Sequence, residues 1–262
     1  MATGPQKYVL LMTACIRPSA DNISRHAIWR NDPEVRLNDY RTALDYWLQY
    51  PDRRISAIVF IENSGYDLQE LRDLARTGNP FGRETEFLQI RAARIPEGLH
   101  YGYSEAEMID HAFTESHLIR QYDHIIKVTG RIFFPGLSRL LDRVRERHLI
   151  VTDCRDFRIF RIRRQMILTT LFIVRKDFYA ERLLDAKARM VSTQTGLIEW
   201  MYYRILRPLY DARPRDLVLR FPINVEPVGF GAHWNIDYSS RKKKLISTGR
   251  GMLRFLFPAL WI

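Results

Sequence analysis

Several features that commonly place a protein in a class are missing from this sequence of 262 residues. Its two cysteines, Cys15 and Cys154, exclude a disulfide scaffold and a zinc site made of cysteines alone. A Walker loop, a G-x-G-x-x-G motif after a strand and a G-x-S-x-G elbow are absent, and the seven histidines lack metal-ligand spacing. No transmembrane helix or secretion signal is evident. We therefore expect a cytoplasmic protein outside the families that these motifs define.

Negative charge is also scarce. The chain has 41 Lys and Arg against 30 Asp and Glu, a net charge of +11. Two segments hold the excess: residues 131–176, with twelve basic and four acidic residues, and residues 241–262, with six basic and no acidic ones. A surplus of this size indicates a polyanionic partner, which can be a nucleic acid, an anionic lipid or a phosphorylated substrate.

The C-terminal segment combines positive charge with an apolar end. Arg241-Lys242-Lys243-Lys244 is followed, after Arg254, by eight apolar residues. Cations attract an anionic leaflet, and Phe, Leu and Trp can enter its acyl boundary, but eight residues cannot span a bilayer. We expect residues 1–240 to form a single domain and residues 241–262 a membrane-associating tail. The alternative is a segment packed on the domain. A nucleic-acid partner is not expected, because such a tail would not usually end in an apolar run.

Hydrophobic patterning predicts alternating strands and helices. Buried strands are expected at 8–14, 55–61, 86–90, 124–128, 149–153 and 168–174. Helices are expected at 37–50, 67–75, 105–121, 137–147, 176–190 and 197–206. Ser104 and Glu107 form a capping-box pattern, and Pro208 is expected to end the last helix. This order predicts an α/β fold with a mostly parallel sheet flanked by helices.

In open α/β folds, ligands bind at the carboxyl edge of the sheet, where the loops 15–30, 62–66 and 127–131 are expected. Glu62-Asn63-Ser64-Gly65 directly follows a buried strand and either binds a ligand or forms a solvated turn. Tyr101-Gly102-Tyr103-Ser104-Glu105 opens a helix, whose N-terminus attracts anions. The alternative for this second group is a capped helix with no ligand.

The third polar group, Lys127-Val128-Thr129-Gly130-Arg131, is the most informative. Two cations flank a Thr-Gly turn at the end of an apolar strand, and Lys127, Thr129 and Arg131 share one side if the strand continues. Burying two cations without an anion is costly, and a Lys with an Arg suits a diphosphate. The alternative is that both cations pair with nearby carboxylates.

The segments Ile61–Leu68, Tyr101–Glu105 and Ile126–Arg131 resemble, in this order, a family of bacterial glycosyltransferase-like proteins. That family is associated with surface polysaccharides such as O-antigen, in lipopolysaccharide, and capsule. The resemblance covers about residues 8–240, and Lys-x-Thr-Gly-Arg is its most specific part. The order of elements also resembles the Rossmann-like GT-A nucleotide-sugar fold. This implies a hexosyltransferase-type enzyme that moves a sugar from a nucleotide-diphosphate donor to a lipid-linked or growing glycan. It would be peripheral on the inner face of the cytoplasmic membrane.

The resemblance to GT-A proteins also implies residue roles. There the first strand and its following loop receive the nucleotide, which selects Thr13 and Arg17. The other expected donor-binding residues are Glu62, Asn63, Ser64, Tyr101, Gly102, Glu105, Thr129 and Gly130. The strand that normally ends in a metal-binding Asp-x-Asp here ends in Lys-Val-Thr-Gly-Arg. Lys127 and Arg131 are therefore expected to supply the metal's positive charge, with a Mn²⁺ or Mg²⁺ ion left as the alternative.

A late GT-A element is an acidic residue at a helix start, often the base of inverting enzymes. Glu199 occupies a similar place, and the alternative is a charge that complements the helix dipole. Asp153 and Asp156 are rival carboxylates unless they pair with Arg155 or Arg158. Two other classes stay open: a nucleic-acid-binding protein, favoured by the net charge, and a non-catalytic scaffold with a degenerate transferase fold.

Overall fold

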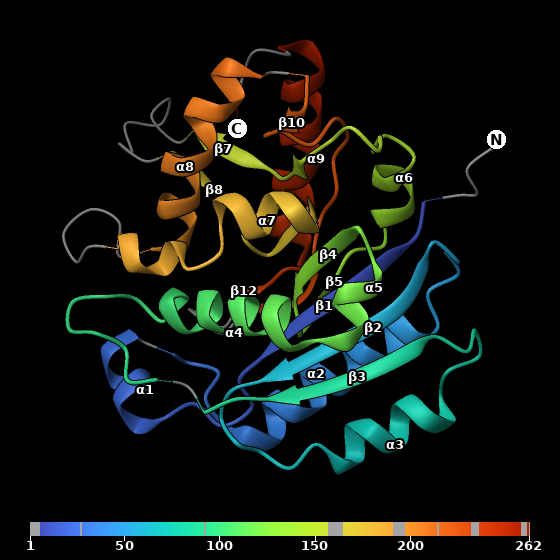
Figure 1. Cartoon of the computed structure of the whole chain (residues 1–262), viewed down its shortest axis with the longest axis vertical. Helices are drawn as coiled ribbons and strands as arrows, with labels where there is room; N and C mark the ends of the chain where they lie inside the picture. The colour runs from blue at the N-terminus through green and yellow to red at the C-terminus, as the bar shows by residue number, and fades with distance from the viewer. Residues whose placement is uncertain are drawn as a thin grey trace.

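The computed structural model describes residues 6–26, 28–91, 93–156, 165–190, 197–213, 215–231, 236–257 and 261. A seven-stranded sheet crosses the molecule in the order β10-β6-β9-β4-β1-β2-β3 (Figure 1). Its strands are β1 (Tyr8–Ala14), β2 (Ile55–Glu62), β3 (Glu84–Gln89), β4 (His124–Thr129), β6 (Ile150–Val151), β9 (Leu171–Arg175) and β10 (Leu217–Val218).

The centre of this sheet is parallel. β1 pairs in parallel with β2 on one side and with β4 on the other, and β2 continues in parallel to β3. β9 runs antiparallel to both of its neighbours, β4 and β6. All seven residues of β1 are buried, as expected for a strand that is covered on both faces. The predicted α/β class with a mostly parallel sheet is confirmed.

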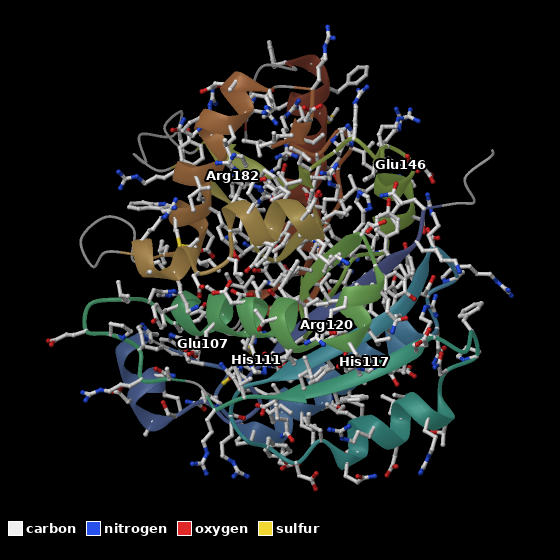
Figure 2. The ribbon with its side chains drawn as sticks, in the orientation of Figure 1. Glu107, His111, His117, Arg120, Glu146 and Arg182 are labelled. Carbon is white, nitrogen blue, oxygen red and sulfur yellow. The ribbon has the colours of Figure 1, made fainter. Side chains whose placement is uncertain are left out.

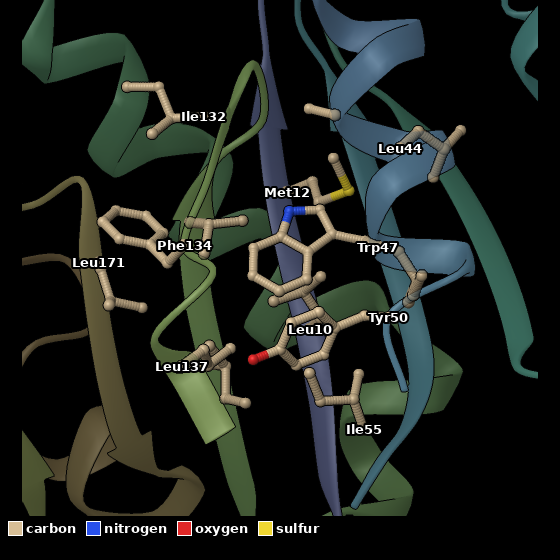
Figure 3. Close-up of a cluster of buried hydrophobic side chains, with 14 of the residues drawn as sticks. Leu10, Met12, Leu44, Trp47, Tyr50, Ile55, Ile132, Phe134, Leu137 and Leu171 are labelled. Atoms are coloured by element: carbon tan, nitrogen blue, oxygen red, sulfur yellow. The ribbon is translucent and has the colours of Figure 1, made fainter. Parts of the chain in front are cut away.

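Helices cover both faces of the sheet. α2 (Pro33–Leu48) and α3 (Gln69–Thr77) pack on one face, and α4 (Gly102–Glu115), α7 (Lys176–Arg182) and α8 (Ile198–Ala212) pack on the other. The residues of β1 divide between the two faces according to the pleat. Leu10 and Met12 pack in the cluster that contains Trp47 of α2 (Figure 3), whereas Leu11 packs with Ile109 of α4.

The amphipathic pattern of α4 decides which side faces the sheet. Ile109 and Ala112 are buried, one turn apart, in the cluster beneath the helix. Glu107 and His111 lie on the partly exposed side of the same helix (Figure 2). α4 therefore covers the sheet with one stripe and leaves its N-terminal end free to contribute to a site.

The helix expected at 105–121 is two helices in the structure. α4 ends at Glu115, and α5 (His117–Gln121) follows after Ser116, whose backbone is extended. The hydroxyl of Ser116 accepts a hydrogen bond from the N–H of Ile119 at 3.0 Å and donates one to Glu86 at 2.5 Å. Ser116 thus caps a new helix, which a single hydrophobic period does not reveal.

The predicted capping box of Ser104 and Glu107 is wrong. The helix begins at Gly102, so Ser104 lies inside its first turn, and its buried hydroxyl has no partner among the described residues. Glu107 instead accepts a hydrogen bond from the N–H of Ala93 at 3.1 Å. The glycine start was not anticipated because tertiary packing, and not a side-chain cap, defines it.

Three other helix boundaries differ from the expectation. α6 (Leu137–Leu141) ends before residue 147, and α7 is separated from a short 3₁₀ helix (Ala186–Arg189) by Asp185, whose φ of +56° breaks the helix. Pro208 lies inside α8 and does not end it. Leu206 and Leu209 pack on the core on either side of this proline, which holds the helix together across it.

Smaller elements complete the fold. A three-stranded sheet, in the order β12-β11-β5, contains β5 (Ile132–Phe133), β11 (Val228–Gly231) and β12 (Ile236–Asp237), and a hairpin contains β7 (Cys154–Asp156) and β8 (Gln165–Ile167). The helices α1 (Ala20–His26) and α9 (Arg241–Leu256) complete the described elements. No helix in the described part of the chain is both long enough and apolar enough to span a membrane.

Candidate active site

A cavity of about 620 Å³ lies at the carboxyl ends of β1, β2 and β4. The register of the sheet explains its position, because Thr13 of β1 aligns with Thr129 of β4, and Ala14 aligns with Glu62 of β2. The loops after these three strands therefore begin at one edge, as predicted, and all three contribute to the wall. The first turns of α4 and α8, together with Tyr238, complete the enclosure.

An ion pair lies at the base of this cavity. Lys127 is fully buried, and its ammonium group contacts Oε1 of Glu105 and donates to the carbonyl oxygen of Thr169 at 2.7 Å. The hydroxyls of Thr13 and Thr129 donate to the same carboxylate oxygen at 3.4 and 3.5 Å. Glu105 belongs to the cavity wall, whereas Lys127 lies behind it. The alternative in which Lys127 pairs with a carboxylate is the arrangement found.

Glu199 faces the same cavity from the first turn of α8. Its Oε1 accepts a hydrogen bond from the hydroxyl of Thr169 at 3.5 Å, while its buried Oε2 has no partner in the described part of the chain. Burial raises the pKa of Glu199 from 4.5 to about 7, and the nearby Glu105 adds to the rise while Lys127 opposes it. Near neutral pH this carboxyl group exists in both forms, as a proton-transfer group requires.

Arg131 is one of the cations of the wall, together with Arg17, Arg36, Arg91 and Arg94. β4 ends at Thr129 and the chain turns at Gly130, so Arg131 does not continue the strand as the alternation predicted. Its Nε donates to the carbonyl oxygen of Phe230 at 2.8 Å, and its Nη1 donates to the hydroxyl of Tyr40 at 3.4 Å. No described carboxylate forms an ion pair with it. A guanidinium group with neutral partners keeps its capacity to bind an anion.

Glu62 organises loops and does not line the cavity. It is fully buried, and its two oxygens accept hydrogen bonds from the N–H groups of Ile16, Ser64, Gly65 and Tyr66 at 2.9 to 3.3 Å. The hydroxyl of Ser64 donates to it as well. These bonds saturate the carboxylate and tie the loop after β1 to the loop after β2. Glu62 therefore shapes the wall from behind.

The residues beside Glu62 do reach the cavity. Asn63 lines the wall, and its buried Oδ1 has no hydrogen-bond partner among the described residues. The hydroxyl of Ser64 accepts a hydrogen bond from the N–H of Arg17 at 2.9 Å, and the guanidinium of Arg17 lies 5.1 Å from the centroid of the Tyr66 ring. Asn63 thus offers an acceptor to a ligand, and Arg17 places an exposed cation in the same wall.

Two glycines allow the close packing on which the site depends. A Cβ on Gly102 would lie 2.8 Å from a side-chain carbon of Ile198, and one on Gly130 would lie 2.7 Å from the carbonyl oxygen of Thr13. Gly102 therefore brings the start of α4 against the start of α8, and Gly130 lets the turn after β4 approach β1. Tyr101 lies beside Gly102 in the wall, and burial raises its pKa well above the usual range.

Asp153 lies outside this cavity, in a buried cluster of charges. It accepts hydrogen bonds from Arg254 of α9 at 2.8 Å, from Arg155 at 3.2 Å and from the N–H of Phe221 at 3.3 Å. Because both guanidinium groups bind Asp153 away from the cavity, the geometry favours Glu199 as the base. Arg158, the other partner expected for these aspartates, lies outside the described residues.

The cavity brings together most of the residues selected from the sequence: Thr13, Arg17, Asn63, Ser64, Tyr101, Gly102, Glu105, Thr129, Arg131 and Glu199. Arg36, Tyr40, Thr169 and Tyr238 are among the wall residues that sequence reasoning missed. The available signal for the first two was their i, i+4 spacing on α2, which places both on one face. Thr169 falls within the strand expected at 168–174, although β9 begins only at Leu171, and Tyr238 has no motif near it, so neither carried a signal.

The residues at the end of β4 do not fit a divalent metal ion. Lys127, Val128 and Thr129 stand where the resemblance places a carboxylate pair, and the Glu105 carboxylate is bound to Lys127. Within the described ranges, no group of three or more His, Cys, Asp or Glu residues could hold a metal. At this position the cation is Lys127, and its anionic partner is Glu105.

No protein-family model matches the chain, and no curated protein matches its sequence. Solved structures resemble it at low identity. The inositol-1-phosphate CTP transferase from T. maritima has a TM-score of 0.49 and 13% identity, covering 93% of this chain and 96% of that one. The bifunctional glycosyltransferase WbbM has a TM-score of 0.48 and 10% identity, covering 84% of this chain and 39% of that one. The 4-diphosphocytidyl-2C-methyl-D-erythritol synthase from Anaerococcus prevotii has a TM-score of 0.44 and 8% identity, covering 94% and 99%.

Proposed function

We propose that the chain is a glycosyltransferase that moves a sugar from a nucleotide-diphosphate donor to a hydroxyl group of a lipid-linked or growing bacterial surface glycan. One observation carries this proposal: Glu199, with a pKa of about 7, shares a cavity with Arg131, which forms no ion pair with a described carboxylate. Sugar transfer needs a base for the acceptor hydroxyl and a positive charge for the leaving diphosphate. The class of glycan, O-antigen or capsule, is proposed from the sequence resemblance.

The proposed reaction assigns one step to each of these groups. The acceptor oxygen forms a bond to the anomeric carbon of the donor sugar as the bond from that carbon to the diphosphate breaks. The electron pair of the broken bond leaves with the nucleoside diphosphate, whose growing charge Arg131 stabilises. The acceptor proton passes to Oε2 of Glu199, which has no partner among the described residues. This assignment corresponds to an inverting transfer.

The remaining wall residues position the donor. Glu105 accepts hydroxyl donors in the structure already, since Thr13 and Thr129 bind its Oε1, and a sugar hydroxyl can use its other oxygen. Asn63 offers its Oδ1, which has no partner in the described part of the chain, to a donor group of the nucleotide or sugar. Lys127 acts through Glu105 and not on the diphosphate directly, which makes it a positioning residue.

We also propose that the reaction needs no metal ion, because the resemblance places Lys-Val-Thr-Gly-Arg where other GT-A proteins have their metal-binding carboxylates. Enzyme treated with EDTA is therefore expected to keep its activity in a nucleotide-release assay. Loss of activity that Mn²⁺ or Mg²⁺ restores would contradict this part of the proposal and leave the assignment of Glu199 untouched.

A membrane surface is the proposed location of the enzyme, with residues 241–262 as the contact. α9 buries Ser247 and Arg254 against the domain. Its outward side exposes Leu245, Ile246, Met252, Leu253, Phe255 and Leu256, followed by Phe257. Phe255 is 84% exposed, and four cations, from Arg241 to Lys244, precede this apolar surface. Such a surface suits the anionic inner face of the cytoplasmic membrane.

Cosedimentation with vesicles tests the membrane contact. Wild-type protein should bind vesicles of phosphatidylcholine and phosphatidylglycerol, and the Phe255→Ser/Leu256→Ser variant should lose most of this binding. The two side chains are exposed, so the variant should unfold at the wild-type temperature. Equal binding by the variant would contradict the proposed surface.

Thermal shift with a panel of nucleotides and nucleotide sugars tests the donor site directly. One nucleotide-diphosphate sugar should raise the Tm, because a ligand that binds only the folded state stabilises it. Arg131→Gln should weaken this binding about tenfold or more, whereas Arg204→Gln, which removes an exposed cation on α8, should not change it. Stabilisation by random DNA with no response to any nucleotide sugar would instead favour the nucleic-acid-binding class.

A further inference from the structure

A second cavity, of about 130 Å³, lies between α9 and the body of the domain. Thr170 and Tyr238 belong to the walls of both cavities. Burial raises the pKa of the Tyr238 phenol, which also senses Arg131 and Glu199 of the first cavity and Arg155 of the second. The two cavities are therefore neighbours that share one aromatic ring and one threonine.

The wall of the second cavity is rich in cations. Its charged members are Asp153, Arg155, Glu226, Lys243 and Arg250. Asp153 also binds Arg254 at 2.8 Å, and Glu226 binds Arg250 at 3.3 Å. The pKa of Arg250 is lowered by burial and by repulsion from Arg155 and Arg254, against which Glu226 acts. Among the described residues, the cations of this cluster outnumber its carboxylates, so an anion would relieve their repulsion.

α9 connects this cluster of charges to the apolar surface of the helix. Lys243, Ile246 and Arg250 line the cavity from one side of the helix, at spacings of three and four residues. Ile246 is also 45% exposed, so the cavity wall continues into the exposed apolar side of α9. The cations of the cavity suit the anionic group of a lipid phosphate, and the exposed apolar side chains of α9 suit its hydrocarbon chain.

We infer that the second cavity binds the phosphate group of a lipid-borne acceptor, with Lys243 and Arg250 as the partners of the phosphate. Its volume has room for several water molecules, and so for a phosphate group, but is far smaller than the first cavity. The inference rests on the proposed function and deepens it, because it assigns the acceptor to a chemical class. The acceptor phosphate would lie beside Tyr238. The same tyrosine also lines the first cavity, where Glu199 lies.

Decyl phosphate, titrated below its micelle concentration and followed by calorimetry, tests this site on the full chain. It should bind wild-type protein, and Lys243→Gln/Arg250→Gln should weaken binding about tenfold or more. Arg182→Gln/Arg204→Gln removes two cations from exposed positions of α7 and α8 and should change the affinity less than about twofold. An equal loss in both pairs, or no loss in the first, would overturn the inference.

A variant of opposite sign separates binding from damage to α9. Glu226→Gln removes the carboxylate that competes for Arg250, so decyl phosphate should bind more tightly, whereas an undocked helix would bind it more weakly.

Inorganic phosphate and decanol should each bind at least about tenfold more weakly than decyl phosphate, because each supplies one of the two contacts. Equal affinity for inorganic phosphate would overturn the lipid assignment. Nucleotide-sugar binding should be unchanged in Lys243→Gln/Arg250→Gln, and its absence in wild type would overturn the donor proposal alone.

Discussion

The end of β2 holds a fully buried glutamate, Glu62, whereas the start of α8 holds a half-buried one, Glu199, in the cavity wall. The structure uses the two side chains in opposite ways. Glu62 accepts hydrogen bonds from four backbone N–H groups and from the Ser64 hydroxyl, which leaves it no capacity for a ligand. Glu199 accepts a single long hydrogen bond from another side chain and keeps a buried oxygen without a described partner.

This difference shows that burial alone does not identify a catalytic carboxylate. Donors aimed at a carboxylate stabilise its charged form, whereas burial without donors favours its neutral form. The pKa of Glu199 accordingly rises to about 7, where it can exchange a proton with a substrate. A saturated carboxylate stabilises the fold, and an unsaturated one in a cavity is available for chemistry.

Replacing Glu199 with Gln should produce the largest effect on activity. The amide cannot take the acceptor proton, so kcat should fall by a factor of about 10² to 10⁴. The Tm should stay at the wild-type value or rise, because the buried charge is gone. Glu181→Gln, at an exposed position of α7, is the matched control and should be fully active. A Glu199→Gln enzyme with wild-type turnover would assign the base to another group.

Replacing Glu62 with Gln should reverse this pattern. One side-chain oxygen becomes an NH₂ group that faces backbone N–H donors, so the free energy of unfolding should fall by about 2–4 kcal/mol. Urea unfolding monitored by circular dichroism measures this, and Glu70→Gln, at an exposed position of α3, should change stability by less than about 0.5 kcal/mol. A stable Glu62→Gln protein that has lost donor binding would instead place Glu62 in the site.

The raised pKa of Glu199 predicts opposite pH dependences for stability and activity. Between pH 4.5 and about 7 the folded protein holds a proton that the unfolded chain has released, so stability falls as pH rises, by up to about 3 kcal/mol. Activity should rise over the same window as the carboxylate forms. The difference in unfolding free energy between wild type and Glu199→Gln, measured in urea at pH 5 and pH 8, isolates this group. Equal differences at the two pH values would refute the raised pKa.

The strands of the parallel centre were predictable from the sequence, whereas later boundaries were not. β1 and β2 are continuous apolar runs that only a doubly covered strand explains, and the parallel order then places their loops at one edge. The structure departs from the predicted helix boundaries in opposite ways at Ser116 and at Pro208. One starts a new helix through a contact with Glu86, and the other stays inside a helix that packing maintains.

The candidate site was predictable as a set of loops but not as a set of roles. Glu62 and Asn63 are adjacent in the sequence, yet only loop geometry decides that N–H groups surround the first and leave an oxygen of the second free. The partners of Arg131 come from α2 and from Phe230, about a hundred residues later, and no local pattern announces such contacts. Charge at a strand end therefore led to one residue of the cavity wall, Arg131, and to one that lies behind the wall, Lys127.

Lys127 forms an ion pair with Glu105 and lowers the pKa of Glu199, and its removal should produce the smallest measurable change. Its positive charge lowers the pKa of Glu199, so Lys127→Met should raise that pKa and move the acid limb of the pH–activity profile upward by about one unit. Activity lost at pH 7 should then return at higher pH. Lys187→Met breaks a comparable buried pair with Asp110, away from the cavity, and should lower stability without moving the limb. If the acid limb of the pH–activity profile does not move in Lys127→Met, ionisation of Glu199 does not determine that limb. The contrast between Glu199 and Glu62 would then say nothing about catalysis.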